Sequence, residues 1–183
     1  MNANQNQPFL SDVNELRRRA REHMEKGAIT ADYKGEVGTT VDILNTALAT
    51  EIVCVLRYKY HAISATGLAS EGVKKEFKEH AEEEQEHADW IAERINQLGG
   101  KPNLNPEGLA SRSHSQYVEG SNLVEMIKEN LVAERIAIES YREIIRYLGV
   151  NDPTTRRLME SILSKEEEHA NEMSDLLTAH AGK

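Results

Sequence analysis

The stretch KEFKEHAEEEQEHADWIAERI, residues 75–95, repeats apolar residues at helical spacing, and Glu84 and His87 lie on the same stripe. A second stretch, ILSKEEEHANEM at residues 162–173, places Glu166 and His169 on an apolar stripe in the same way. Side chains three positions apart share one face of a helix. Each Glu-x-x-His pair is therefore expected to point into a helical core, where both groups can reach the same pair of metal ions.

Two further glutamates lie on apolar stripes of their own. Glu51 is in phase with Leu48 and Val55, and Glu134 falls between Leu131 and Ile138. The spacing from the single Glu to the following Glu-x-x-His pair differs by only one residue between the two halves of the chain. The sequence thus predicts two similar helical hairpins, each giving one Glu and then a Glu-x-x-His pair.

The composition favours one all-α domain. The 183 residues include only 2 Phe, 1 Trp and 4 Pro, while Ala, Leu, Ile, Glu, Lys and Arg are abundant. Four long helices are expected at 41–66, 70–98, 121–149 and 153 to the C-terminus, with Ser70 opening the second and Thr40, Ser121 and Asp152 as N-terminal caps of the other three. We assign residues 40–183 to this bundle and residues 1–39 to an extension with a helix near 11–26, capped by Ser11.

The lengths of the connections order the four helices. The first and third connections are short, so each joins an antiparallel hairpin, whereas the second spans residues 99–120 and can cross the length of the bundle. Asn105, Pro106 and Glu107 could start a short helix within it. One long crossover between the second and third long helices is the topology expected.

Four buried carboxylates are costly unless their charge is balanced. Two Fe²⁺ ions would balance the four carboxylates, and oxygen and imidazole ligands suit iron or manganese. Either Glu-x-x-His pair alone could equally be part of a solvated helix face. The joint pattern of all four helices favours a metal site, for which the candidate ligands are Glu51, Glu84, His87, Glu134, Glu166 and His169.

This joint pattern resembles the ferritin-like superfamily and, through a histidine on both hairpins, bacterioferritin in particular. The resemblance covers residues 41 to about 180, and the turn GGKPNL at 99–104 and the position of Tyr58 support it. It implies that Glu84 and Glu166 bridge two iron ions, that Glu51 and Glu134 bind one ion each, and that His87 and His169 do likewise. Manganese or zinc could replace the iron.

The activity implied by the resemblance is that of a ferroxidase. Fe²⁺ would be oxidised by O₂ or H₂O₂, and ferric mineral would be stored inside a homo-oligomeric shell. Gln85 stands where bacterioferritin has the methionine that binds haem, so no haem is expected. Few residues follow His169, and a helix is added before the bundle as in Dps-type mini-ferritins. We therefore expect a 12-subunit shell rather than a 24-subunit one.

The charge and the single cysteine limit partners and location. With 31 acidic and 22 basic residues the net charge is -9, so DNA is not an expected partner. The basic run at 17–21 is nearly cancelled by acidic residues around it. No export signal or membrane span is evident, and Cys54 has no cysteine partner, so we expect a cytoplasmic protein.

Two alternatives remain open at this level. One is a rubrerythrin-like peroxidase or a manganese catalase that turns over peroxide without storing iron, although no Cys-rich iron module accompanies the bundle. The other is a non-catalytic bundle whose buried acids are satisfied by other contacts. Cys54, Tyr58 and Tyr141 are expected near the site as core or hydrogen-bonding residues, and His80 as a structural residue.

Overall fold

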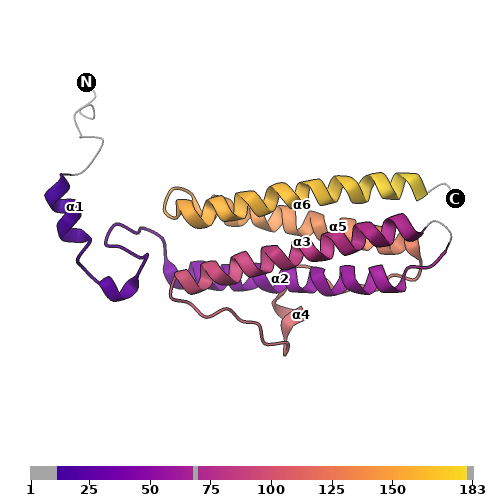
Figure 1. Ribbon diagram of the computed structural model, residues 1–183, viewed down its shortest axis with the longest axis horizontal. Helices are drawn as coiled ribbons and strands as arrows, with labels where there is room; N and C mark the ends of the chain where they lie inside the picture. Colours follow the sequence, from indigo (N-terminus) through magenta and orange to yellow (C-terminus); the bar gives the residue numbers. More distant parts are fainter. Residues whose placement is uncertain (1–11, 68–69, 181–183) are drawn as a thin grey trace, which may run out of the picture.

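The computed structural model describes residues 12–67 and 70–180. Its helices are α1 (Val13–Arg19), α2 (Val37–Ser64), α3 (Ser70–Gln97), α4 (Leu109–Arg112), α5 (Leu123–Leu148) and α6 (Pro153–His180), with one 3₁₀ turn, η1 (Met24–Lys26). Helices α2, α3, α5 and α6 lie side by side in one bundle, and α1 projects from one end of it (Figure 1). The all-α class and the four-helix bundle expected from the sequence are confirmed.

The bundle consists of two hairpins joined by a long crossover. Helix α2 pairs with α3 and α5 pairs with α6, and the segment between α3 and α5 runs back along α2 and carries α4 (Figure 1). Buried Arg57 of α2 fixes the end of this crossover, because its guanidinium donates to the Ser115 hydroxyl at 3.0 Å and to the Gln116 carbonyl at 2.9 Å. Its Nε also donates to Asn130 of α5 at 2.8 Å. The crossover is thus tied to both hairpins.

The apolar core is divided into two parts. One cluster, around Leu48, Ile91 and Ile162, fills one end of the bundle, and a second, around Phe77, Ile127 and Met173, fills the other. Between the two lies a layer of ionisable side chains. This layer sets the place of the candidate site at mid-bundle.

Several helix ends differ from the sequence-based expectation. Helix α2 begins at Val37 rather than Val41, because Val37 packs against the core, so Thr40 is a buried residue of the first turn and not the cap. Asn122 rather than Ser121 caps α5, accepting from the Glu125 amide at 3.1 Å. Ser70 is the first residue of α3, as expected, and Asp152 precedes α6 as its cap, with the Asp152 carboxylate accepting from the Thr155 amide at 2.9 Å.

The N-terminal extension contains less helix than expected. Ser11 lies outside the described residues, and the carboxylate of Asp12 caps α1, which ends at Arg19. Exposed Val13 and Leu16 give α1 no apolar face against the bundle, so burial does not stabilise a longer helix. The short helix of the crossover likewise begins at Leu109, later than expected.

Helix α2 is, among the described residues, the one helix that is long and apolar enough on length and composition to cross a membrane. However, 56% of its most apolar stretch is buried inside the bundle, and it carries Glu51 and Arg57 in the core. These features are those of a core helix.

Candidate metal centre

All six side chains singled out from the sequence converge in the polar layer between the two apolar clusters. None of the six is more than 1% exposed. The contributors are Glu51 from α2, Glu84 and His87 from α3, Glu134 from α5, and Glu166 and His169 from α6. Each of the four long helices therefore contributes at least one ionisable group.

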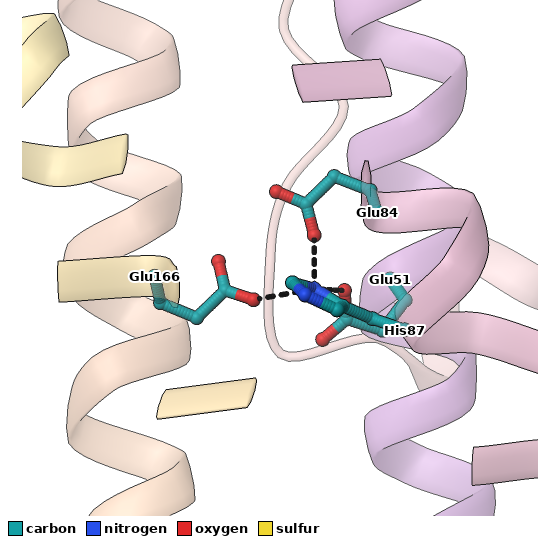
Figure 2. A group of neighbouring side chains, drawn as sticks. All are labelled: Glu51, Glu84, His87 and Glu166. Carbon is teal, nitrogen blue, oxygen red and sulfur yellow. Dashed lines mark hydrogen bonds and ion pairs between the residues drawn. The ribbon is translucent and has the colours of Figure 1, made fainter. Parts of the chain in front are cut away.

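The first half of the centre is built around the His87 imidazole. Its Nδ1 lies 3.0 Å from an oxygen of Glu166, 3.3 Å from one of Glu84 and 3.5 Å from one of Glu51. Figure 2 shows Glu84 and Glu166 approaching this nitrogen from different directions, with Glu51 beside the ring. One ligand atom from each of the four side chains falls within a sphere small enough to surround one cation.

The second half is built in the same way around His169. Its Nδ1 lies 3.2 Å from an oxygen of Glu84 and 3.8 Å from one of Glu166, and Glu134 completes the group. Ligand atoms in each half lie within 4.8 Å of one another. Glu84 and Glu166 belong to both halves, so their carboxylates are placed to bridge two cations.

Two tyrosines hold the two glutamates that belong to only one half each, Glu51 and Glu134, which we call the outer glutamates. Tyr141 of α5 donates its hydroxyl proton to Glu51 of α2, and Tyr58 of α2 donates to Glu134 of α5. Each tyrosine lies seven residues after one of these glutamates in the sequence, yet it contacts the glutamate of the other hairpin. The two hairpins are therefore locked together through the centre.

Several buried carboxylate oxygens in the centre have no hydrogen-bond partner among the described residues. They are Oε2 of Glu51, Oε2 of Glu134 and both oxygens of Glu166, of which Glu166 Oε1 and Glu51 Oε2 have only the ion-pair contact with His87 Nδ1. Such atoms are costly in a core because they have lost water without gaining a donor. A cation bound among these side chains would satisfy them. Carboxylate and imidazole donors in this number suit a divalent iron, manganese or zinc ion.

The pKa values of the side chains reflect the same crowding of charge. Burial, followed by the negative charge of Glu84, raises the pKa of Glu51 to about 8. Burial, with Glu84 and Glu51 nearby, raises the pKa of Glu166 well above its ordinary value. For the histidines burial acts downward on the pKa, but the hydrogen bonds that the imidazoles donate to nearby carboxylates, and the negative charge of those carboxylates, outweigh it, raising the pKa of His87 to about 10 and of His169 to about 9. The protein groups alone thus retain protons that a cation would displace.

The comparisons with known proteins identify the family of this bundle. The family model described as the ferritin-like domain matches residues 41–181. The chain belongs to the ferritin-like family. The matched range begins four residues after the start of α2 and continues through α3 and α5 to the end of α6.

The relatives of this ferritin-like chain include a starvation protein and a bacterioferritin. It is 32% identical over 146 residues to the DNA protection during starvation protein of Pyrococcus furiosus, covering 78% of this chain and 79% of that one. It is 32% identical over 139 residues to bacterioferritin from Brucella melitensis, covering 74% and 80%.

A solved structure described as a dodecameric thioferritin, the bacterioferritin-related protein of Bacteroides fragilis, has a TM-score of 0.77 with 36% identity. The alignment covers 81% of this ferritin-like chain and 89% of that one.

Sequence reasoning missed part of the surroundings of the centre. His80, treated as structural, bonds the Tyr58 hydroxyl through Nδ1 at 3.1 Å and stacks on the His169 ring. Its position four residues before Glu84, on the same helical face, was the available signal. The buried Arg57, whose guanidinium also lies 3.5 Å from the Cys54 sulfur, was also missed. The presence of a charged residue within the otherwise apolar sequence of α2 was the signal that could have indicated a buried arginine.

Proposed function

We propose that this chain oxidises Fe²⁺ with O₂ or H₂O₂ at the six-residue centre and stores the ferric product inside a homo-oligomeric shell in the cytoplasm. The observation that carries the proposal is the set of unpartnered, buried carboxylate oxygens around two adjoining positions that share Glu84 and Glu166. Relatives among bacterioferritins support iron chemistry at the level of the family.

The proposed roles follow from which groups share each position. Glu84 and Glu166 would bridge two Fe²⁺ ions, Glu51 and His87 would bind one of them, and Glu134 and His169 the other. Each Fe²⁺ gives up one electron. Two electrons with two protons reduce O₂ to H₂O₂, or reduce H₂O₂ to two waters. The Tyr58 and Tyr141 hydroxyls hold the outer glutamates in the orientation that this binding needs.

For the shell, we propose twelve subunits, supported by the similarity to the structure described as dodecameric. With a chain mass of 20.6 kDa, light scattering should give a particle of roughly 250 kDa, whereas twenty-four subunits would give roughly 490 kDa.

Neither haem nor DNA is part of the proposal. Gln85 has no sulfur to offer haem iron, and its exposed amide donates to Asp89 at 3.0 Å. In the basic run, Arg18 pairs with Glu15 and Glu22, so its charge is matched locally rather than left for a phosphate backbone. A mobility-shift titration at moderate salt should show no retardation of duplex DNA.

The experiment that tests the function loads the metal-free protein with Fe²⁺ under anaerobic conditions and then adds O₂ or H₂O₂. Ferric absorbance and the iron retained per subunit after gel filtration are recorded. We expect retention of many more ions than the two that the centre can bind. Retention of only two, with continued peroxide consumption, would instead assign the chain to the di-metal peroxidases.

The matched variants separate catalysis from structure. Glu84→Ala with Glu166→Ala should abolish rapid Fe²⁺ oxidation while the shell still elutes at its normal volume. Glu79→Ala with Glu160→Ala, which removes two exposed glutamates from the same two helices, should leave oxidation unchanged. Unchanged oxidation in the first variant would show that the six-residue centre is not the site.

A further inference from the structure

The two halves of the centre have the same ligand types, but the residues that surround them differ. The residue just before Tyr58 is Arg57, whereas the residue just before Tyr141 is Ser140. Arg57 is fully buried. Ser140 is half-buried, and its hydroxyl donates to the Ala137 carbonyl at 3.1 Å. The internal repeat of the chain is therefore broken by a buried cation at one of two matching positions.

Packing places Arg57 beside the second half of the centre, the one that contains Glu134. Its Nε donates to Asn130 of α5 at 2.8 Å, and Asn130 stands about one helical turn before Glu134. The guanidinium carbon lies over the Tyr58 ring, 5.8 Å from its centroid, and the Tyr58 hydroxyl donates to Glu134. Arg57 thus contacts the tyrosine that holds a candidate metal ligand of this half.

The hydrogen bonds of Arg57 leave its charge unpaired. Besides Asn130, the acceptors are the Ser115 hydroxyl, the Gln116 carbonyl and the Cys54 sulfur. Burial raises the pKa of the Cys54 thiol well above its ordinary value, so this sulfur is neutral near pH 7. Among the residues that the structure describes, no carboxylate forms an ion pair with Arg57. Because arginine stays protonated and little water reaches the core, this positive charge acts beyond its immediate contacts.

We propose that Arg57 weakens cation binding in the second half of the centre, at Glu134 and His169, more than in the first half, at Glu51 and His87. Two metal ions that share bridging carboxylates lie roughly 3.5 to 4 Å apart. Coulomb repulsion falls with distance, so the ion nearer to Arg57 is repelled more strongly. The proposal rests on metal binding by the centre, which is part of the proposed function, and does not require oxidation.

Acidic side chains on the same side of the centre oppose Arg57 in part. An oxygen of Glu83 lies 2.5 Å from His169 Nε2, and one of Glu172 lies 2.8 Å from His80 Nε2. These two glutamate side chains are 43% and 41% exposed, so water and salt screen them more than the buried guanidinium. Variants at Arg57 leave these acids in place and therefore isolate the effect of the arginine.

The charge of Arg57 acts more strongly on Fe³⁺ than on Fe²⁺, because Coulomb repulsion scales with the charge of the ion. A ferric ion is consequently held less tightly in the second half than in the first. This half is the one from which oxidised iron leaves first. The consequence for Fe³⁺ depends on oxidation at the centre, whereas the effect on divalent ions does not.

The test compares Arg57→Gln, which removes the charge, with Arg57→Lys, which keeps it. Crystals of the full chain are soaked at a Zn²⁺ concentration that fills both halves only partly, and the two anomalous peaks give the occupancies. The affinity of the second half relative to the first should rise roughly threefold or more in Arg57→Gln. Arg57→Lys should keep the wild-type ratio. Both variants lose guanidinium bonds to the crossover, so a purely structural role predicts the same change in both.

Two further variants complete the test. Arg57→Met repeats the loss of charge with a side chain that needs no hydrogen bonds. Arg135→Gln removes an exposed arginine that directly follows Glu134 in the chain, and it should leave the ratio unchanged. An unchanged ratio in the neutral variants, or an equal change in Arg57→Lys, would overturn the proposal and leave the proposed function intact. A wild type without a Zn²⁺ peak in either half would overturn both.

The effect on ferric iron has a kinetic readout of its own. After about two Fe²⁺ per subunit have been oxidised, a second addition of Fe²⁺ measures how many centres have been emptied. Arg57→Gln should recover its fast oxidation more slowly than the wild type and Arg57→Lys. Equal recovery in all three proteins would refute the role of Arg57 in releasing ferric iron.

Discussion

Replacing Glu51 by Gln tests whether the centre destabilises the protein when no metal is bound. Glu51 is 1% exposed, and one of its oxygens lacks a hydrogen-bond donor among the described residues. Gln keeps the shape and can still accept from Tyr141, but it carries no charge. The substitution therefore removes the ionisation of this carboxyl and little else.

The magnitude follows from the pKa of Glu51, which burial and the charge of Glu84 raise from 4.5 to about 8. A group whose pKa is raised on folding contributes stability that is fully present below its unfolded pKa. That contribution is lost as the pH rises through the pKa that the group has in the folded protein. The full difference between the pKa values of Glu51 in the unfolded and folded states corresponds to at most about 5 kcal/mol of folding stability. Because Glu84 shares a hydrogen bond with Glu51 and compensates in part, we expect about 2 to 5 kcal/mol.

The assay is urea unfolding in the presence of EDTA at about pH 5 and about pH 8.5. The Gln variant should gain about 2 to 5 kcal/mol relative to the wild type between these two pH values. Asp42→Asn, an exposed change on the same helix, should show no such pH-dependent gain. If the stability difference between wild type and Glu51→Gln were the same at both pH values, the destabilisation ascribed to the buried carboxyl would be wrong.

Three other outcomes are expected. Zn²⁺ binding near pH 7 should release between about two and four protons per subunit, because Glu51, Glu166 and both histidines have raised pKa values. Calorimetry in buffers of different ionisation enthalpy measures the number of protons released, and the absence of any release would contradict the prediction. Tyr141→Phe should weaken metal binding roughly 10- to 100-fold in equilibrium dialysis, because Glu51 loses its donor, whereas Tyr147→Phe at an exposed position should not. Asp152→Ala should cost about 3 to 5 kcal/mol in urea unfolding at pH 7 by leaving buried Arg94 without its ion pair. Hydrogen bonds lower the pKa of Asp152 despite burial, so the advantage of the wild type should be lost as the pH falls below 3.8.

The bundle and the convergence of the six side chains could be predicted because helical periodicity alone determines which residues face inward. Glu51 and Glu134 lie in phase with apolar neighbours, and each Glu-x-x-His spacing fixes a shared face. Connection lengths then decide which helices are neighbours. Whether the six residues bind iron in solution stays a prediction for the experiments above.

The remaining features depend on how helices are rotated and packed, which one-dimensional spacing does not specify. Seven-residue spacing predicts that Tyr58 lies near Glu51, whereas the packing of α2 against α5 directs its hydroxyl to Glu134. The contact between His80 and Glu172 could not be predicted, because Glu172 is distant in sequence and reaches His80 only after α3 packs against α6. The start of α2 at Val37 likewise depends on a core contact rather than on a local capping residue.

The crosswise tyrosine contacts have a consequence for the chain during its synthesis. Each outer glutamate is oriented by a residue of the opposite hairpin, and α6, which supplies Glu166 and His169, follows α2, α3 and α5 in the chain. Each half of the six-residue centre is therefore complete only after both hairpins have packed together. A hairpin released from the ribosome on its own holds at most three of the six side chains, so the complete centre forms only in the finished domain.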